Sequence, residues 1–384
     1  MNDYKILIFQ RLIPAYRLPV FKALYEKLDI MVVCSNNGSE ADQTDFSNQI
    51  DFPHEKARRF WISKKKKIFI QNVFSVLKKH KPKVVLCEAA FGNLTSLLLR
   101  LLKPFFGYHF VVWTHGIENH EILNPYQSLR GKLLLKFLNS ASGIVFYSQD
   151  RMTKATPFLR KNQALFVASN TIDSILYNKI FADLEKKGRQ NLRKELNMDS
   201  YFNLLYIGRV IPSKRINFIA KVMDLLNSEK TIHLHVIGSG SDLQLLKNLD
   251  HQNQIHYHGM SYDIIQNAKY LYCSDLLINP GYLGLSVVET FAFACPVITS
   301  QTTKNGPFHS PEIVYVKNDL NGIVIEDDPL IYVDEIVKMK MDRTYREKLS
   351  QNARATFLKE CSIENFINGF AQMKNYFKEK DEKK

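Results

Sequence analysis

The chain has no apolar run long enough to cross a membrane. Among its 384 residues the most apolar stretch is LTSLLLRLLKPFFGYHFVVW (94–113), which Arg100, Lys103 and Pro104 interrupt. A membrane span needs about 20 clean residues. The N-terminal MNDYKILIFQ carries an acidic residue and continues directly into a strand-like run, unlike a signal peptide. These absences predict a cytoplasmic protein.

Paired cysteine motifs are also missing. No CxxC spacing occurs among the five cysteines, Cys34, Cys87, Cys273, Cys295 and Cys361. This scatter predicts free thiols in a reducing compartment and argues against a disulfide framework or a zinc site. The sequence has no internal repeat, and its one low-complexity tract, the charged KEKDEKK (378–384), predicts a frayed tail.

Positive charge is concentrated in the first half of the chain. Of the net +14, residues 1–168 contribute 25 Lys and Arg against 12 Asp and Glu, which is +13. The remainder holds 27 against 26, which is +1. An apolar share of 45% and a charged share of 23% are those of a soluble globular protein. The length suits two domains of about 150–200 residues each.

Seven of the cations lie in KARRFWISKKKKIFI (56–70), among aromatic and aliphatic side chains. One interpretation is a solvated loop. The other is contact with an anionic membrane surface, where each basic residue contributes about 1 kcal/mol and aromatic rings lie at the interface. Nucleic acid would attract the same charge, but no RNA- or DNA-binding motif accompanies it, so we expect no nucleic-acid partner.

Short apolar runs alternate with helical patterns along the chain. The runs are 5–10, 30–34, 83–87, 110–115, 143–148, 203–208, 233–238, 255–259, 276–280 and 295–300. Helical patterns such as 18–28, 72–80, 129–139, 216–226 and 286–294 lie between them. This order is typical of parallel βα units covered on both faces. It predicts an α/β fold of two Rossmann-like domains facing across a central cleft, where ligands bind beyond the carboxyl ends of the strands.

The domains are expected to divide near residue 168. Residues 1–168 form the first Rossmann-like domain and 169–360 the second. The polar stretch around 170–200 has few strand signals and is the expected hinge. Residues 361–384 are expected to form a C-terminal helix and charged tail that packs back on the N-terminal domain.

The stretch YIGRVIPSKRINFIAK (206–221) ends a predicted strand and opens a helix. Gly208 ends the strand, Arg209 follows, and Lys214 lies five residues later in the same loop. A planar guanidinium and a mobile ammonium at the carboxyl edge of a sheet suit a diphosphate. The alternative is a solvated loop that happens to carry cations.

A second turn, in VIGSGSDLQLLKNL (236–249), places Gly238 and Gly240 between a strand and a helix. Free N–H groups at such a helix start favour an anion or the polar edge of a nucleotide. The signal is weak alone, because the third glycine of the dinucleotide fingerprint is missing.

The third stretch is NPGYLGLSVVET (279–290). Ser286 and Glu289 match an S-x-x-E capping box, which explains both residues without a ligand. Gly281 and Gly284 remain unexplained, since glycine is needed where backbone is left-handed or approaches a ligand closely. The helix start would also carry about half a positive charge.

Taken together, these motifs resemble the nucleotide-sugar domain of family 4 glycosyltransferases of the GT-B fold. The resemblance rests on GR-x4-K, the glycine turn and P-x3-GLS-x2-E-x5-CPVIT, and it extends to NGPFHSPEIVYVKNDLNGIVI (305–325). In the first half WTHG (113–116) and ASNTID (168–173) are similar to the family's strand-ending histidine and to its passage into the second domain. The resemblance covers most of residues 110–330.

The resemblance implies roles for individual residues. Arg209 and Lys214 would hold the donor diphosphate, Glu289 would bind the ribose hydroxyls, and His115 would contact the donor sugar. The backbone of Gly284, Leu285 and Ser286 would meet the sugar or phosphate. No metal and no separate cofactor are expected, since the nucleotide-diphosphate sugar is itself the substrate.

Two stretches depart from the family pattern. The family's first glutamate would fall at Gly281, which leaves the identity of the sugar open. The N-terminal loop reads RLIPAYRLPVF (11–21) in place of the usual paired glycines. There Arg11 or Arg17 would take over a phosphate contact, or the loop would shape an acceptor site.

Other polar residues carry weaker signals. His233 and His235 share one strand face, as do His256 and His258, but no third metal ligand has suitable spacing. Glu88 ends a predicted strand at the expected cleft edge, where it is either a base, an acceptor contact or a plain strand-end carboxylate.

The resemblance implies a retaining glycosyltransferase. It would move a sugar from a nucleotide-diphosphate donor to a glycan or polyprenyl-linked acceptor in bacterial surface-polysaccharide assembly, such as capsule or O-antigen. The enzyme would be peripheral at the inner face of the plasma membrane, held to anionic lipid by residues 56–70. The alternatives are a catalytically degenerate GT-B protein that acts as a membrane-complex partner, and a nucleotide-sugar epimerase.

Overall fold

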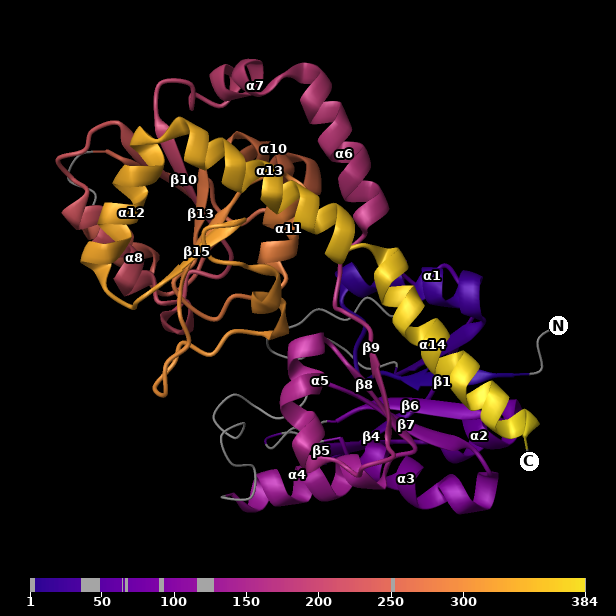
Figure 1. Cartoon of the computed structure of the whole chain (residues 1–384). Coiled ribbons are helices and arrows are strands. Elements are labelled where there is room, and N and C mark those ends of the chain that lie inside the picture. The colour runs from indigo at the N-terminus through magenta and orange to yellow at the C-terminus, as the bar shows by residue number, and fades with distance from the viewer. Residues whose placement is uncertain are drawn as a thin grey trace. The chain divides into compact units, whose positions relative to one another are not determined.

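The computed structural model describes residues 4–35, 49–63, 65, 68–89, 93–115, 128–249 and 253–383. The chain forms two compact units, Met1–Asp173 with Ile363–Lys384, and Ser174–Ser362 (Figure 1). The divisions fall a few residues beyond the expected positions 168 and 360. Each unit is built on its own parallel sheet, as the alternating apolar runs predict.

The first unit contains a seven-stranded parallel sheet in the order β3-β2-β1-β6-β7-β8-β9. Its strands are β1 (Ile6–Phe9), β2 (Ile30–Cys34), β3 (His54–Lys56), β6 (Val84–Glu88), β7 (His109–Thr114), β8 (Gly143–Phe146) and β9 (Ala164–Val167). Ile6 of β1 pairs with Ile30 of β2 on one side and with Val84 of β6 on the other. Strands β1 and β8 are completely buried because their residues are apolar on both faces.

Helices cover both faces of this sheet. The helices α1 (Leu18–Leu28) and α14 (Ile363–Glu382) belong to one core cluster. The opposite face carries α2 (Phe74–His80), α3 (Leu94–Phe106), α4 (Leu129–Ser140) and α5 (Gln149–Ala155). Short 3₁₀ turns, η1 (Ala15–Arg17) and η3 (Thr156–Phe158), complete the unit.

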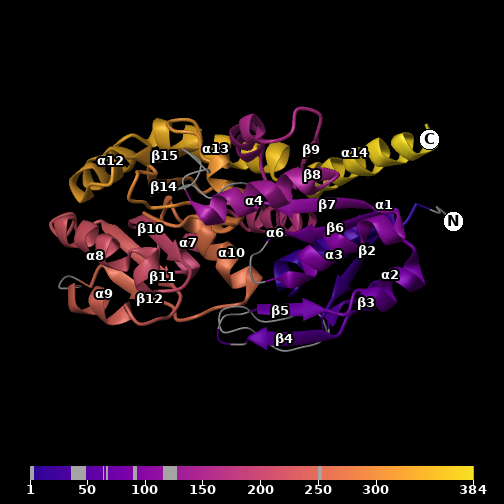
Figure 2. The ribbon, with the colours of Figure 1, turned by 90° about the horizontal axis from the view of Figure 1, so that it is seen from below.

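The basic stretch 56–70 contributes an antiparallel hairpin of β4 (Arg59–Ser63) and β5 (Ile68–Gln71), shown in Figure 2. Strand β5 packs against α3. Arg59 is buried, with its guanidinium 5.3 Å from the Trp61 ring centroid, and therefore belongs to the hairpin's packing. Lys64, Lys66 and Lys67 lie outside the described residues.

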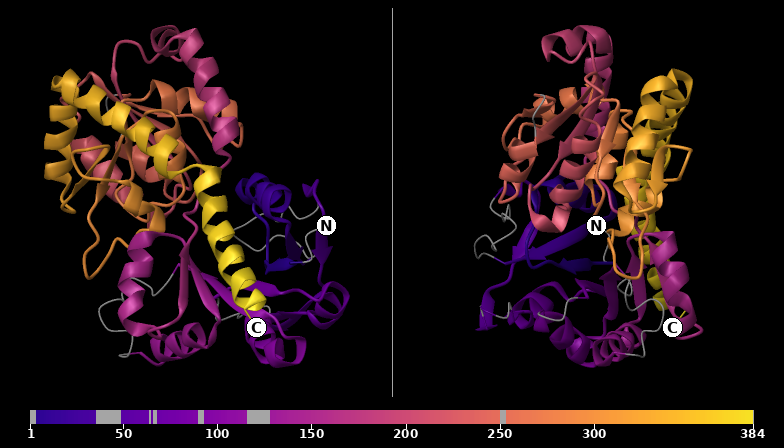
Figure 3. Two further views of the ribbon diagram at one scale, coloured as in Figure 1. Left: turned by 45° about the vertical axis from the view of Figure 1, so that its right-hand side comes forward. Right: turned by 90° about the vertical axis from the view of Figure 1, so that its left-hand side faces the viewer.

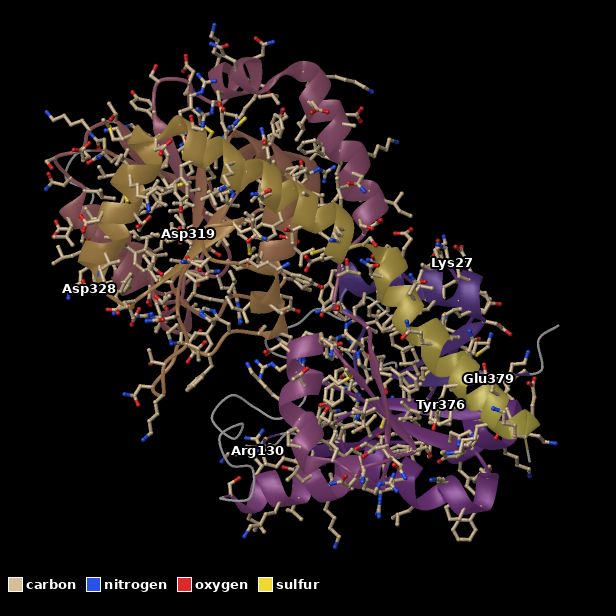
Figure 4. The ribbon with its side chains drawn as sticks, in the orientation of Figure 1. Lys27, Arg130, Asp319, Asp328, Tyr376 and Glu379 are labelled. Carbon is tan, nitrogen blue, oxygen red and sulfur yellow. The ribbon has the colours of Figure 1, made fainter. Side chains whose placement is uncertain are left out.

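The charged tail was predicted to be frayed, and this prediction is wrong, because α14 continues to Glu382 and packs beside β9 and α1 (Figure 3). Asp381 accepts hydrogen bonds from the Tyr4 hydroxyl at 3.1 Å and from His109 Nε2 at 2.8 Å. On α1, Lys27, which is labelled in Figure 4, lies 3.8 Å from Glu364. These contacts tie the end of the chain to the first unit.

The second unit contains a six-stranded parallel sheet in the order β12-β11-β10-β13-β14-β15. Its strands are β10 (Phe202–Ile207), β11 (Ile232–Ile237), β12 (Ile255–Tyr257), β13 (Leu276–Ile278), β14 (Val297–Ser300) and β15 (Gly322–Ile325). Its helices are α6 (Ser174–Lys187), α7 (Arg189–Glu195), α8 (Ile216–Leu225), α9 (Leu243–Leu249), α10 (Ile264–Cys273), α11 (Ser286–Ala292), α12 (Pro329–Met341) and α13 (Arg343–Glu360). Two 3₁₀ turns are η4 (Pro212–Lys214) and η5 (Pro311–Tyr315).

The stretch 170–200, which is predicted to have few strands and to be the hinge, holds the helices α6 and α7 and no strand. Both pack against α10 within the second unit. Their polarity reflects exposure of one helix face, since Tyr177, Ile180 and Leu184 are buried while most of the remaining side chains face solvent. In the part of the chain that the structure describes, no helix is both long and apolar enough to cross a membrane.

Candidate functional site

In each sheet the strand order reverses at one strand, and strands later in the chain are added on the other side of it. In the second unit β10 lies between β11 and β13, so the segments that follow β10 and β13 leave the sheet at adjacent positions. Ligands of open parallel sheets bind at such a switch point, beyond the carboxyl ends of the strands. Residues 208–215 and 279–286 therefore form the first candidate site.

The glycines after β10 and β11 allow two loops to pair through their backbones. The Gly208 N–H donates to the Ile237 carbonyl at 3.0 Å, and the Val210 N–H donates to the Ser239 carbonyl at 2.9 Å. A side chain at Gly238 would collide with the Gly208 carbonyl, and one at Gly240 would collide with the Val210 carbonyl. Close backbone approach thus accounts for Gly238 and Gly240.

Arg209 and Lys214 lie together on these loops. The Lys214 ammonium donates to the Tyr282 carbonyl at 2.7 Å, which joins the β10 loop to the segment after β13. Burial lowers the pKa of Lys214, and the positive charge of Arg209 lowers it further. Two cations that repel each other at the carboxyl edge of a sheet form a site that an anion would stabilise.

Arg215, the next cation, makes structural contacts within the second unit. Its guanidinium makes a bidentate ion pair with Asp327, with N···O distances of 2.5 and 2.6 Å, and also donates to the Pro280 carbonyl at 3.0 Å. The sequence analysis did not identify this partner of Arg215. Asp327 is 112 residues away, so no local signal could reveal the pair.

Gly281, at the position of the family's first glutamate, is buried beneath Arg215. A Cβ atom at this residue would lie 2.6 Å from Arg215 Cδ and 3.3 Å from Pro307 Cβ. A glutamate could not occupy position 281 unless Arg215 moved. The packing of Arg215 therefore explains a glycine that the sequence alone left unexplained.

The predicted capping box of Ser286 and Glu289 is wrong. Helix α11 begins at Ser286 itself, its N-cap residue is Leu285 with helical backbone angles, and no side chain caps it. The Glu289 carboxylate turns instead toward α6, where it accepts a hydrogen bond from the Tyr177 hydroxyl at 3.2 Å. Gly284, by contrast, has room, since a Cβ there would meet only Ser310 at 3.7 Å.

Glu289 is consequently a half-buried carboxylate with an unusual environment. Burial raises its pKa, and the hydrogen bond from Tyr177 offsets only part of that rise. A carboxylate in such a place gains from further hydrogen-bond donors. Sugar or ribose hydroxyls are donors of that kind.

His309 is a positioning residue that sequence reasoning missed. Its Nδ1 accepts a hydrogen bond from the Leu283 N–H at 3.1 Å, so its Nε2–H donates to the Ser300 carbonyl at 2.7 Å. Both bonds require a neutral ring, and burial lowers the pKa of His309 accordingly. The ring fixes the segment before α11 to the end of β14.

In the first unit a cavity of about 300 Å³ lies at the corresponding switch point, beside β1 and β6. His115, directly after β7, lines this cavity and stacks on Tyr147 with ring centroids 4.2 Å apart. Burial, aided by the Arg17 charge, lowers the pKa of His115 to about 4. The imidazole is therefore neutral near pH 7 and can exchange hydrogen bonds with uncharged hydroxyl groups.

Arg17 and Glu88 form an ion pair at 2.8 Å in the same cavity. Arg17 also donates to the Tyr147 hydroxyl at 2.7 Å, and its guanidinium lies 4.6 Å from the Trp113 ring centroid. Burial alone would raise the pKa of Glu88, but the Arg17 charge and hydrogen bond hold it below its usual value. Arg17 is thus already paired with a carboxylate, and Arg11 also lines the cavity.

The histidine pairs in the second unit are hydrogen-bonded to each other. His233 Nδ1 lies 2.7 Å from His256 Nε2, and His235 Nδ1 lies 3.0 Å from His258 Nε2. Within the described residues no group of three or more His, Cys, Asp or Glu side chains is placed to hold a metal. These histidines belong to the packing of β11 against β12.

The expected residues therefore fall into two groups. Arg209, Lys214, Gly281, Gly284 to Ser286 and Glu289 surround the switch point of the second unit, whereas His115 lines the cavity of the first unit. Gly116 of the WTHG motif lies outside the described residues.

Solved structures resemble the whole chain. HepE from Anabaena, crystallised with UDP, gives a TM-score of 0.71 at 15% identity over 96% of this chain and 99% of its own. A glycosyltransferase from Rickettsia africae gives 0.70 at 15% identity over 98% and 99%. Sucrose-phosphate synthase from Thermosynechococcus elongatus gives 0.69 at 15% identity over 97% and 98%. At such identities the likeness shows the fold, and the predicted GT-B class is confirmed.

Sequence comparison finds a family match within the second unit. No curated protein matches the chain. The model of a family described as glycosyl transferases group 1 matches residues 201–342. That range contains Arg209, Lys214 and Glu289, together with the glycine turns. The predicted enzyme class, glycosyltransferase, is thereby confirmed, and the residues that match the group 1 model lie within the second unit.

Proposed function

We propose that this glycosyltransferase moves a sugar from a nucleotide-diphosphate donor to a glycan or lipid-linked acceptor, with retention of anomeric configuration. The donor class is supported by HepE, a protein of the same fold that has been crystallised with UDP-glucose and with UDP and glucose. Retention of configuration is proposed from the resemblance to family 4.

The pair of Arg209 and Lys214 carries this proposal. Both cations lie at the switch point of the second sheet, and Arg209 contributes to the lowered pKa of Lys214. A diphosphate carries roughly two to three negative charges. Its binding would therefore replace the repulsion between Arg209 and Lys214 with attraction of each cation to the diphosphate. Fixed charges that meet the developing charge of the leaving diphosphate stabilise the transition state without a metal ion.

The remaining residues would position the donor. Glu289 would accept hydrogen bonds from ribose hydroxyls, and the backbone of Gly284 to Ser286 would meet the sugar or phosphate. His115 would contact the donor sugar as a neutral imidazole. The aliphatic Cγ and Cδ atoms of Arg215 take the space beside Gly281, so position 281 would offer the sugar no carboxylate.

The cellular role proposed is bacterial surface-polysaccharide assembly by an enzyme that is peripheral at the inner face of the plasma membrane. The β4–β5 hairpin supports contact with anionic lipid, because Phe60 and Ile62 are exposed beside its cations. Each basic residue near such a surface contributes about 1 kcal/mol.

Thermal unfolding with UDP, GDP, ADP, CMP and dTDP tests the donor site. A ligand at 100 times its Kd stabilises the bound fold by about 2.7 kcal/mol, which is a visible shift. We expect one nucleotide to raise the midpoint in the wild-type protein and in Lys221→Ala, an exposed cation of α8. Arg209→Ala should abolish the shift. A shift of the same size in Arg209→Ala would contradict the proposed donor site.

A further inference from the structure

Helices α3 and α4 lie on the face of the first unit opposite α1 and α14 (Figure 1). A second cavity is lined by residues of these two helices. Its volume is about 240 Å³. The apolar lining comes from both helices, with Leu97, Leu133, Leu134 and Phe137. The same two helices carry further apolar side chains that are exposed to solvent, namely Leu101, Phe105 and Leu129.

The charge of these two helices has a single sign. Together α3 and α4 carry five cations and no acidic residue, the cations being Arg100, Lys103, Arg130, Lys132 and Lys136. Arg100 and Lys136 line the cavity itself. Arg100 donates through Nε to the Ser140 hydroxyl at 2.5 Å, which holds the guanidinium at the cavity wall. Figure 4 labels Arg130 on α4.

This cavity adjoins the one that contains His115. Ala89, the residue after Glu88 at the end of β6, lines both of them. A molecule whose apolar part occupied the α3–α4 cavity would therefore have its polar end beside His115 and the Arg17–Glu88 pair.

We infer that the α3–α4 cavity binds the hydrocarbon chain of a phosphate-bearing lipid, the carrier part of a lipid-linked acceptor. Arg100 and Lys136 would bind the phosphate, and the glycan would extend toward His115. The inference rests on the proposed function, whose acceptor it specifies. It places the acceptor lipid on α3 and α4, apart from the basic hairpin 56–70.

Size and charge favour this occupant over others. A volume of about 240 Å³ is below the roughly 300 Å³ at which sites for whole drug-sized ligands begin, so the cavity suits a segment of one chain. Exposed leucine and phenylalanine flanked by cations are typical of surfaces that contact anionic lipid. A protein helix would bury the apolar residues equally well, but it would need acidic groups to match Arg100 and Lys136, which line the cavity.

Vesicle binding tests the inference. Full-length protein is sedimented with phosphatidylcholine vesicles that contain either a polyprenyl phosphate or phosphatidylglycerol, matched for surface charge. We expect the polyprenyl phosphate vesicles to bind at least about tenfold more tightly, which corresponds to about 1.4 kcal/mol. Equal affinity for the two vesicles would overturn the inference, because any anionic surface would then suffice. No binding to either would overturn it in favour of a protein partner.

A matched pair of variants locates the site. Leu97 in the cavity and Leu225 on α8 of the second unit are equally exposed, at 46% each. Leu97→Glu should remove the preference for polyprenyl phosphate, whereas Leu225→Glu should retain it. Leu133→Gln gives a milder second variant should Leu97→Glu not fold. A preference that survives both cavity variants would overturn the inference.

Two soluble probes separate chain from phosphate. Farnesyl phosphate should protect the protein against thermal unfolding more than inorganic phosphate does at the same concentration, and Leu97→Glu should remove that difference. If farnesyl phosphate and inorganic phosphate protected the protein equally, only the phosphate would contribute to binding. That result would overturn the assignment of the cavity to a hydrocarbon chain. The nucleotide shift, measured in the same variants, reports separately on the donor site.

Discussion

Arg215 adopts a left-handed backbone conformation, with φ at 58°, between η4 and α8. This conformation costs a residue with a Cβ roughly 1–2 kcal/mol. The bidentate pair with Asp327 and the ring of Phe218, whose centroid lies 4.7 Å from the guanidinium carbon, stabilise it. The same side chain covers Gly281, so the two residues depend on each other.

A double-mutant cycle measures this dependence. Gly281→Ala should lower the free energy of unfolding by about 1–3 kcal/mol, because it inserts a methyl group where the protein is already packed. In an Arg215→Ala background the same change should cost less, since the atom that it meets at 2.6 Å is gone. Urea unfolding of the four proteins gives the coupling energy. Additive effects would show that Arg215 does not restrict position 281.

For individual residues, the sequence predicted which types of side chain lie at the site better than it predicted their hydrogen-bond and ion-pair partners. Arg209 and Lys214 could be selected because they follow a strand at the expected edge, and Glu289 was selected through the resemblance to family 4. The actual partners of Glu289 and Arg215 are Tyr177 and Asp327, each 112 residues away. Such contacts depend on helix packing across the sheet, which no local pattern encodes.

Among the elements, β11 and β12 carry a continuous chain of neutral hydrogen bonds. Asn203 donates its amide N–H groups to backbone carbonyls, so its Oδ1 accepts from His235 Nε2 at 3.1 Å. His235 Nδ1 then accepts from His258, whose other nitrogen accepts from the Tyr270 hydroxyl. A second proton on His235 would point at an N–H group. Burial and the neighbouring histidines lower the pKa of His235 to about 3.

This arrangement predicts that stability falls in mild acid. The pKa of His235 is about 3 in the folded protein and about 6.5 when unfolded, so its stabilising effect is complete above pH 6.5. Below that pH the unfolded state binds the proton and stability declines by about 1.4 kcal/mol per pH unit. Urea unfolding at pH 7.5 and pH 5 should show a loss of roughly 2 kcal/mol from His235. His235→Gln should flatten the dependence, and an unchanged slope would contradict the assignment.

Most strands that consist of apolar runs were predicted, but β9 (ALFV) and β15 (GIVI), which are equally apolar, were missed. All ten predicted strands are present. The polar β3 was missed because HEK (54–56) forms a strand only by pairing with β2 at the sheet edge. The hairpin of β4 and β5 was missed because its cations dominate the composition.

On the scale of the whole molecule, each unit has its own hydrophobic core, and the C-terminal helix belongs to the first. Phe370 of α14 is fully buried, with its ring centroid 5.4 Å from that of Trp113. Because the two cores are separate, we expect the two units to unfold in separate transitions.

Phe370→Ala should therefore destabilise the first unit selectively. Truncation of a buried phenylalanine costs about 3–5 kcal/mol, so the calorimetric transition of the first unit should move to lower temperature. The nucleotide-induced shift should persist, because it reports on the second unit. Tyr376→Ala, on the exposed side of the same helix (Figure 4), should cost about 1 kcal/mol or less. Loss of the nucleotide shift in Phe370→Ala would contradict this division.

In the proposed donor site, Arg209 and Lys214 together hold a nucleoside diphosphate. Isothermal titration calorimetry, with the nucleotide that stabilises the protein, measures this directly in wild type, Arg209→Ala, Lys214→Ala and Lys221→Ala. Hydrogen bonds to charged groups contribute about 1.5–3 kcal/mol, so each site variant should weaken Kd by at least about tenfold, and Lys221→Ala should bind like wild type. Wild-type affinity in both Arg209→Ala and Lys214→Ala would contradict the account.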